Sequence, residues 1–421
     1  MFLRSIQLKN FRGFTDQSLS FVETNKEGKE SIRKSTILLG QNGTGKSNLL
    51  KAIGLVLAGR SALPSLMEDV DGWVQYRKKR CQVDATLQTQ AGELREITLH
   101  IERGMKIADV IDENHDSLSK LEDALEYTER SYFTVGYGAS RRLNTGGSKS
   151  RKRTRRESDY RSGNLASLFS SEAQLTPIEE WAMDLDYQRN RSGLAMVRQV
   201  FSKFLRNVKF EKIDKKTGTL LFRTPDGLIP MSNLSDGYQN VAGWVGDLLY
   251  RISVVFDDYT DPLSTRGVLI IDELDLHLHP KWQRDLIGFL KNQLPNMQVI
   301  ATTHSPITAQ QARMNELWYV ERRRSSCQIE QFEGDPSKLL LHQLVMSDLF
   351  DISSDESVAV EKIKNRYKTL KGIKSRTARQ DKEMAKLKVE ISEMPVHMRT
   401  NTPLSSQQMN LLLKIQKEMG S

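Results

Sequence analysis

Apolar and polar residues alternate along several stretches in the first half of the chain. The pattern is clearest at 3–11 and in two runs within 81–102, which are separated by a short Ala-Gly turn. Because the side chains of a strand point alternately to its two faces, alternation predicts strands that are covered on one face. The two runs are therefore expected to form an antiparallel hairpin, and a second hairpin is expected at 208–223 around a Thr-Gly turn.

Three short runs are mainly apolar, without alternation, and lie at 35–39, 267–272 and 297–303. Continuous apolar runs of this length predict strands that are buried on both faces. The first run is followed at 46–58 by apolar residues at the spacing of a helix, and the other two runs are joined by a predicted helix at 281–293. This last segment is a βαβ unit, which implies a parallel sheet covered by helices.

Weaker patterns complete the predicted elements. Strand-like composition recurs at 132–138, and two further strands are predicted at 317–323 and 327–333. Helices are predicted at 105–130, 236–253, across the Lys- and Glu-rich stretch 336–394, and in an amphipathic stretch at 405–418.

Composition narrows the class of protein. The 421 residues include only two cysteines, Cys81 and Cys327, which are too few for a disulfide scaffold. The N-terminus lacks the apolar core of a signal peptide, and no run reaches the ~20 apolar residues of a membrane span. We therefore expect a cytoplasmic protein with no membrane segment.

The formal net charge of +9 favours contact with polyanions such as nucleic acid. Much of the excess lies in a loop predicted at 145–163, where six Lys or Arg residues fall among residues 149–156. The loop is flanked by glycines and has no apolar periodicity. A solvated loop without a ligand and a loop that contacts phosphates both agree with this composition.

A glycine-rich motif between the strand at 35–39 and the helix at 46–58 predicts phosphate binding. Residues 40–47 read GQNGTGKS and fit G-x-x-x-x-G-K-[ST]. In such a loop the backbone N–H groups and the helix N-terminus surround phosphates, the lysine reaches the β- and γ-phosphates, and the hydroxyl ligates Mg²⁺. A glycine-rich turn without a ligand is the alternative. We predict ATP contacts at Gly40, Asn42, Gly43, Thr44, Gly45, Lys46, Ser47 and Asn48.

Two carboxylates end the apolar strand at 267–272. Asp272 is expected to hold Mg²⁺ together with Ser47, and Glu273 to activate the attacking water. Acidic residues at a strand end are common by themselves. After a phosphate-binding loop, however, this pair indicates nucleotide hydrolysis.

Two further motifs follow in an order that fits the same chemistry. Ser235 and Gly237 lie in LSDGYQN, before a predicted helix, and His304 ends a strand 31 residues after Glu273. A Ser-Asp pair is also an ordinary helix cap, and a histidine after a strand is often structural. Their order after the glycine-rich loop is similar to that of the signature segment and the switch histidine of ABC ATPases. This resemblance implies that Ser235 and His304 lie beside the γ-phosphate, with Lys46, Glu273 and His304 as the catalytic set.

Together these motifs resemble the ABC ATPases, and details of 1–335 resemble their RecF/SMC-like branch. The opening LKNFRGF is similar to the first strand of that branch, which implies that Arg12 lies near the nucleotide. The runs at 137–142, 167–169 and 272–280 resemble the stand-alone ATPases of anti-phage defence, such as PtuA of the Septu system and retron-associated ATPases. The chain departs from transporter ATPases in having no clear Q-loop glutamine and in carrying His279 where they have an aspartate.

The resemblance implies an α/β fold, namely an ABC-type P-loop head with a mixed sheet, an antiparallel β lobe and helical insertions. The head is expected at 1–335, with a helical insertion lobe at 105–205, and a helical C-terminal region at 336–421 for oligomer or partner contacts. ATP and Mg²⁺ are the implied cofactors, and a dimer sandwiching ATP is the implied assembly.

Two functions are compatible with this resemblance. The first is an ATPase that controls a separate nuclease, of HNH type or similar, in bacterial anti-phage defence. The second is a RecF/SMC-like ATPase of DNA repair or chromosome maintenance. The region after residue 336 lacks the pattern of a Toprim nuclease domain, so nuclease activity of the chain itself is not expected, and His277 with His279 predicts no metal site.

Overall fold

The computed structural model consists of two compact units, Met1–Asp351 and Ile352–Ser421. Most of the predicted basic loop, 145–156, and the predicted helix at 405–418 lie outside the described residues. The structure describes residues 1–24, 27–127, 132–141, 157–176, 178–189, 191–205, 207–256, 261–347, 349–350, 352 and 356–393.

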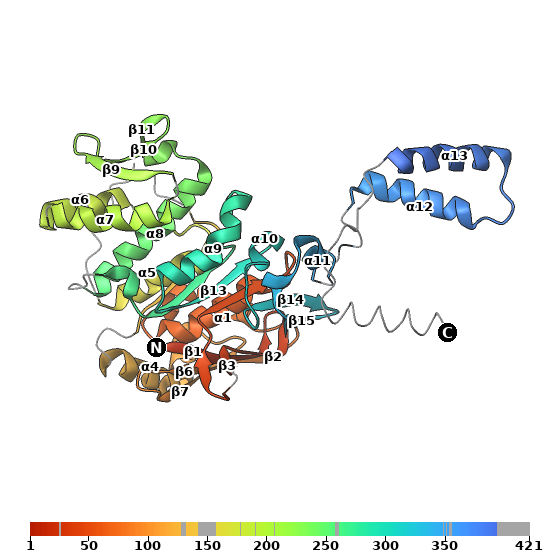
Figure 1. The fold of residues 1–421 in the computed structure, drawn as a ribbon. Helices are drawn as coiled ribbons and strands as arrows, with labels where there is room; N and C mark the ends of the chain where they lie inside the picture. Colours follow the sequence, from red (N-terminus) through yellow and green to blue (C-terminus); the bar gives the residue numbers. More distant parts are fainter. Residues whose placement is uncertain are drawn as a thin grey trace. The chain divides into compact units, whose positions relative to one another are not determined.

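The central sheet of the first unit has six strands in the order β15-β14-β5-β13-β12-β8 (Figure 1). Neighbouring strands from β14 to β8 run parallel, and β15 is an antiparallel strand at one edge. The predicted strands are present. Their bounds are Ser35–Leu39 (β5), Thr134–Tyr137 (β8), Gly267–Ile271 (β12), Met297–Thr303 (β13), Leu317–Arg323 (β14) and Ser326–Gln331 (β15).

Side chains of the parallel strands alternate between two hydrophobic cores. In β12, Val268 and Ile270 belong to one core, whereas Leu269 and Ile271 belong to the other. Both faces are covered, which explains why these strands are continuous apolar runs in the sequence. The carboxyl ends of the parallel strands meet at one edge of the sheet, so the polar residues that follow β5, β12, β13 and β8 are brought together there.

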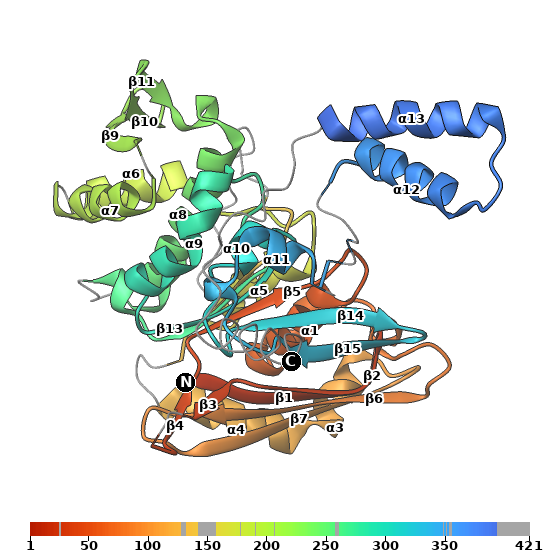
Figure 2. The same cartoon turned by 45° about the vertical axis from the view of Figure 1, so that its right-hand side comes forward.

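A second, antiparallel sheet has the order β2-β1-β6-β7 and contains the hairpin predicted at 81–102. Helix α1 packs between this sheet and the central one (Figure 2). The sequence did not predict β2, because only two of its seven side chains, Phe14 and Leu19, are buried. The elements are Phe2–Phe11 (β1), Phe14–Ser20 (β2), Val22–Thr24 (β3), Glu30–Ile32 (β4), Lys46–Ala58 (α1), Arg80–Gln88 (β6) and Leu94–Glu102 (β7).

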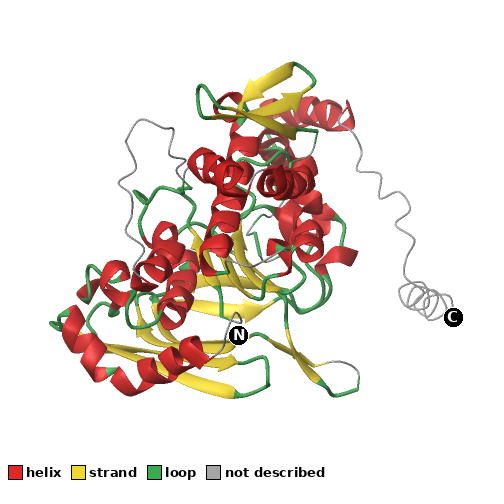
Figure 3. Ribbon diagram, turned by 90° about the vertical axis from the view of Figure 1, so that its left-hand side faces the viewer, coloured by secondary structure: helices red, strands yellow, loops and turns green. Residues whose placement is uncertain are grey.

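A lobe of helices and a small three-stranded sheet covers the other face of the central sheet (Figure 3), whereas the helix that precedes this lobe, α5, packs on the same face as α1. Residues 157–163, which were predicted as part of the basic loop, form the first turns of α5, because Leu165 and Leu168 of this helix pack against β8 and α1. The elements are Glu157–Phe169 (α5), Ile178–Arg189 (α6), Arg191–Phe204 (α7), Lys209–Asp214 (β9), Thr219–Thr224 (β10), Gly227–Pro230 (β11) and Asp236–Val255 (α8).

The remaining elements are short helices around these layers and a separate helical hairpin. In the second unit, α12 and α13 run antiparallel, and Arg366 donates from two nitrogens to the carboxylate of Glu383 across the hairpin. The elements are Leu63–Leu66 (α2), Ile107–Glu113 (α3), His115–Tyr127 (α4), Pro280–Gln293 (α9), Pro306–Ala309 (α10), Leu341–Val345 (α11), Val358–Gly372 (α12) and Ala378–Glu393 (α13).

Candidate nucleotide-binding site

The glycine-rich loop at 40–47 connects β5 to α1, as the sequence predicted. Gly43 and Gly45 have φ angles of 77° and 103°, in the left-handed region that favours glycine. A Cβ on Gly40 would lie 2.3 Å from the carbonyl oxygen of Val320, so a side chain there would displace the loop. The backbone thus forms a tight turn that leads into the N-terminus of α1, where N–H groups can face an anion.

The Lys46 side chain folds under this loop. Its Nζ donates to the carbonyl oxygens of Gly40 at 2.8 Å and Gln41 at 2.9 Å. Burial lowers the pKa of Lys46 to about 8, although the carboxylates of Asp272 and Glu273 act in the opposite direction. The ammonium group is therefore charged at neutral pH and is held on the inner side of the loop.

Asp272 joins the ends of three elements. Its carboxylate accepts hydrogen bonds from Ser47 Oγ and from Thr302 Oγ1, both at 2.6 Å, and only 7% of the residue is exposed. These oxygens come from the end of β12, the first turn of α1 and the end of β13. A carboxylate beside a hydroxyl is the donor set that Mg²⁺ takes in nucleotide sites, so the residues fit the predicted ion.

Glu273 and His304 lie side by side next to this cluster. His304 Nε2 is 3.9 Å from Glu273 Oε1, and about a third of each side chain is exposed, at 35% and 33%. Burial, and after it the charge of Lys46, lowers the pKa of His304 below 6.5, against the opposing effect of the carboxylates. The imidazole is thus neutral at neutral pH, with one nitrogen available to donate a hydrogen bond.

The backbone at Glu273 is constrained. Its φ angle is 49°, which is uncommon for a residue with a side chain, and its N–H donates to Thr302 Oγ1 at 2.7 Å. Thr302 therefore orients both carboxylate residues. Sequence reasoning did not single out Thr302, although it belongs to the TTHSP run that contains His304.

Arg12 lies near the start of α1. Its Nη1 donates to Asn48 Oδ1 at 2.6 Å, and its guanidinium stacks 3.9 Å from the centre of the Trp73 indole. Burial lowers the pKa of Arg12, while the charge of Asp69 raises it. Arg12, in the turn between β1 and β2, and Asn48, in the first turn of α1, were both predicted to contact ATP and are therefore neighbours.

The exposures of the other predicted loop residues differ. Thr44 is buried and its Oγ1 donates to the carbonyl oxygen of Gln41 at 2.9 Å, whereas Asn42, Gly43 and Ser47 are exposed. Thr44 thus stabilises the turn, and the exposed residues present its outer surface.

The signature segment, residues 234–240 (LSDGYQN), lies at the N-terminus of α8. Ser235 is exposed and precedes the helix, but its side chain makes no capping hydrogen bond. A Cβ on Gly237 would lie 2.8 Å from the carbonyl oxygen of His277, so α8 packs closely on the segment after Glu273. Among the described residues, no hydrogen bond joins Ser235 or Gly237 to the loop at 40–47.

His279 has a local structural role. It is the N-cap of α9, and its Nδ1 accepts a hydrogen bond from the N–H of Lys281 at 3.2 Å. Within the described part of the chain, no group of three His, Cys, Asp or Glu residues could hold a metal ion.

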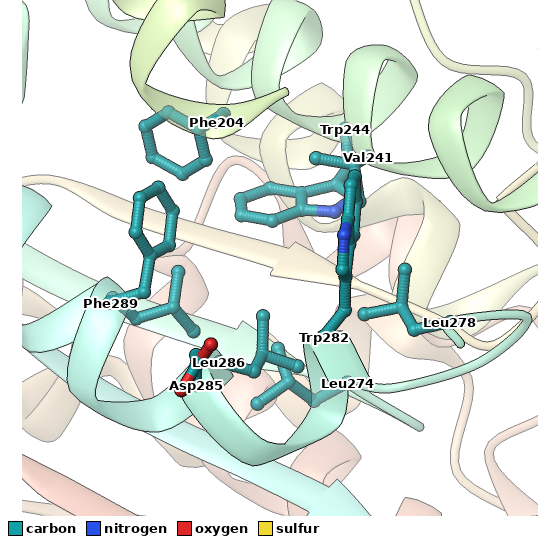
Figure 4. Close-up of a pocket in the computed structure, with 10 residues that line it drawn as sticks. Phe204, Val241, Trp244, Leu274, Leu278, Trp282, Asp285, Leu286 and Phe289 are labelled. Atoms are coloured by element: carbon teal, nitrogen blue, oxygen red, sulfur yellow. The ribbon is translucent and has the colours of Figure 1, made fainter. Parts of the chain in front are cut away.

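A small apolar pocket with a volume of about 30 Å³ is lined by residues of α7, α8 and α9 (Figure 4). Among the described residues that line it, Asp285 is the only charged one. A carboxylate repels phosphate, so we assign the nucleotide to the loop at 40–47 and not to this pocket. The other lining residues are Phe204, Val241, Trp244, Leu274, Leu278, Trp282, Leu286, Phe289 and Leu290.

Arg141 is a second residue that sequence reasoning did not place in the site. Its guanidinium donates to the backbone carbonyls of Asp272 and Glu273, and the side chain is buried. Burial lowers its pKa to about 10, so it remains charged at neutral pH beside the two carboxylates. The available signal was its position in the run at 137–142, which contributed to the family resemblance.

Comparison with known proteins agrees with the motifs. Residues 1–101 match a family described as "AAA ATPase domain", and residues 108–309 match one described as "AAA domain, putative AbiEii toxin, Type IV TA system". The chain is 25% identical over 309 residues to the Septu protein PtuA of Bacillus mycoides (strain KBAB4), covering 73% of this chain and 38% of that protein. It is 40% identical over 97 residues to the Retron Vc95 probable ATPase of Vibrio cholerae serotype O1 biovar El Tor, covering 22% of this chain and 19% of that protein.

Among solved structures, the SMC head bound to the C-winged helix domain of ScpA aligns with a TM-score of 0.47 and 13% identity, over 79% of this chain and 98% of that one. The sequence matches, to ATPase domains over 1–101 and 108–309, show a chain similar to ATPases of the ABC/SMC-like class, with the ATP binding that an ATPase domain implies. Within that class it is related to Septu PtuA and to the retron ATPases. It spans less than two fifths of the length of these relatives.

Among the described residues, no helix has both the length and the apolar composition needed to cross a membrane.

Proposed function

We propose that this chain hydrolyses ATP as a dimer and controls a separate nuclease, of HNH type or similar, in bacterial anti-phage defence. The observation that carries the proposal is the convergence of Ser47, Asp272 and Thr302 at the sheet edge, beside Glu273 and His304. The relation to Septu PtuA and the retron ATPases supports a role in defence.

Each residue of this cluster has a role that its surroundings support. Lys46 and the N–H groups of the loop hold phosphates, and Ser47 and Asp272 hold Mg²⁺, which when bound withdraws charge from the phosphates. Glu273 accepts a proton from water, because its carboxylate lies at the exposed side of the cluster. His304 is neutral and donates a hydrogen bond to a phosphate oxygen.

The position of Ser235 supports the proposed dimer. Its hydroxyl is exposed, is not used as a helix cap, and has no described hydrogen bond to the loop of its own chain. An exposed hydroxyl at a helix N-terminus suits a phosphate held by a second subunit. Two sites would then form, each from the loop of one subunit and Ser235 of the other.

Mixing two inactive variants tests this arrangement. Ser235→Arg is expected to bind ATP but not to hydrolyse it, and Lys46→Ala is expected not to bind ATP. A heterodimer of the two has one intact site, so the mixture should regain hydrolysis if the sites act independently. Full ATPase activity from Ser235→Arg protein that sediments as a monomer in ATP would exclude the dimer mechanism.

A phage challenge tests the defence function. Cells that express this chain together with its neighbouring genes should resist phage, and both Lys46→Ala and Glu273→Gln should remove protection while leaving the protein level unchanged. An adjacent nuclease gene supplies the matching control, because its inactivation should abolish protection without affecting ATP hydrolysis. Unchanged protection with both ATPase variants would contradict the proposal.

The RecF/SMC-like alternative rests on the opening segment of the chain. Arg12, stacked on Trp73 and bonded to Asn48, belongs to the LKNFRGF segment that supports this resemblance. A repair ATPase predicts that loss of the gene sensitises cells to DNA damage without changing phage resistance. The two phenotypes therefore separate the functions.

A further inference from the structure

Arg141 makes four hydrogen bonds that connect separate parts of the head. It follows β8 by four residues and is 9% exposed. Its Nη2 donates to the carbonyl oxygens of Asp272 and Glu273 at 2.5 and 2.6 Å, and its Nε donates to Gly138 at 3.1 Å. One side chain therefore holds the peptide groups of both acidic residues against the end of β8.

The fourth hydrogen bond connects Arg141 to α8, the helix that follows Ser235. Arg141 Nη1 donates to Asn240 Oδ1 at 3.1 Å, and Asn240 Nδ2 donates to the carbonyl oxygen of Leu276 at 3.0 Å. Asn240 lies at the end of the first turn and a half of α8, five residues after Ser235. Asn240 thus connects the first turns of α8 to the segment that carries the two carboxylates.

A second connection between α8 and β8 lies two turns further along the helix. Asp247 is fully buried, and its carboxylate accepts from Tyr137 Oη at 3.0 Å and from Arg251 Nε at 2.5 Å. The backbone carbonyl of Tyr137 in turn accepts from the N–H of Asp272 at 2.7 Å. Helix α8 is thus connected to the end of β8 at two levels, at Asp247 and, nearer its Ser235 end, through Asn240 and Arg141.

We propose that Arg141 is a positioning residue that couples the N-terminus of α8 to the orientation of Asp272 and Glu273, so that engagement of Ser235 by a second subunit sets the geometry for hydrolysis. This inference rests on the proposed ATPase function. Arg141 touches neither acidic side chain directly in this role. It acts through their carbonyl groups and through Asn240.

The guanidinium is required because three of its nitrogens donate in different directions within one plane. Lysine has one nitrogen on a flexible stem and cannot hold Gly138, Asn240 and the two carbonyls at once. Arg141→Lys therefore preserves the charge but loses the connection, which separates the positioning role from simple electrostatics.

The test compares Arg141→Lys, Arg141→Met and Asn240→Leu with Arg33→Met. Arg33 is a matched control, because it is also buried, at 2% exposure, and its side chain also donates several hydrogen bonds. Its acceptors are Thr36 Oγ1, at 3.0 Å, and the carbonyl oxygen of Ser20. Arg33 precedes β5 and therefore lies at the end of this strand that is remote from the loop at 40–47. The three coupling variants should keep the parent affinity for ATP, measured by titration. Their kcat should fall by about 10²-fold, the cost of a small misplacement at a reacting centre.

Hydrogen exchange of the nucleotide-free protein gives a readout that does not depend on hydrolysis. The N–H groups of Glu273 and Leu274 donate to Thr302, so their exchange reports on the acidic segment. We expect faster exchange there and in the first turns of α8 in the coupling variants, and parent-like exchange in Arg33→Met. If Arg141→Met does not fold, Arg141→Lys and Asn240→Leu carry the test.

The results separate this inference from the proposed function. A parent protein that binds ATP but shows no hydrolysis contradicts the proposed function, while the exchange data still decide whether Arg141 couples the two segments. A parent protein that hydrolyses ATP, with Arg141→Lys at the parent kcat and parent exchange, overturns the inference and leaves the ATPase function standing. A common loss of ATP affinity in all variants also overturns it, since it indicates a general structural role.

Discussion

Replacing Asp247 by asparagine is expected to destabilise the head strongly, because it leaves a buried cation without its counter-ion. The Asp247 carboxylate is 0% exposed, and the Arg251 side chain with which it pairs is 11% exposed. Asp247 also accepts from the N–H of Thr176 at 2.8 Å and from Tyr137 Oη. Asparagine keeps the shape and one acceptor oxygen, but its amide group would face the guanidinium with a donor.

The expected loss follows from this burial. Removing one partner of a buried ion pair costs about 3–5 kcal/mol, whereas removing both charges together can be close to neutral. A loss of that size is a large part of the 5–15 kcal/mol that stabilises a typical domain. We therefore expect Asp247→Asn to lower the free energy of unfolding by about 3–5 kcal/mol, and the double variant Asp247→Asn with Arg251→Met to recover most of it.

Urea unfolding followed by tryptophan fluorescence measures this effect, since the five tryptophans all lie in the first unit. Glu211→Gln is the matched control. Glu211 accepts from Arg223 Nε and Nη2 at 3.0 and 3.1 Å, but both side chains are exposed at the surface, at 38% and 58%. The control should change the unfolding midpoint little. Equal losses for Asp247→Asn and Glu211→Gln, or no recovery in the double variant, would refute the reasoning.

Four further outcomes are expected. ATP affinity should fall as pH rises through about 8, because the nucleotide-free Lys46 loses its proton there, and Lys46→Arg should remove this dependence in a calorimetric titration. Glu273→Gln should bind ATP and accumulate a dimer detectable by sedimentation, and turnover at the parent rate would exclude Glu273 as the base. The pKa of His304, measured by NMR in the nucleotide-free protein, should lie below the ordinary histidine value of 6.5, because burial disfavours the charged imidazole. A pKa above that value would contradict this account of the His304 environment. Deleting 149–156, the basic residues that precede α5 in the sequence, should lower the slope of log affinity for duplex DNA against log salt by about 0.9 for each lost phosphate contact, and an unchanged slope would leave the segment without a phosphate-binding role.

The sequence determined the features that depend on neighbouring residues. The glycine spacing in 40–47 predicts its tight turn, because Gly43 and Gly45 have positive φ angles that favour glycine. The apolar runs at 267–272 and 297–303 predict buried parallel strands, since residues on both of their faces enter a core. The acidic residues and His304 are found at the ends of these strands, where the chain changes from buried to exposed.

The tertiary structure decided which of these residues meet and what else joins them. Ser47, Asp272 and Thr302 are far apart in the chain, and their hydrogen bonds exist only because α1 begins and β12 and β13 end at the same sheet edge. The role of Arg141 was not predictable, because three of its four acceptors are backbone carbonyls, which have no signature in the sequence. Strand β8 takes its place beside β12 through pairing across more than a hundred residues, and periodicity within a segment carries no information about such a partner.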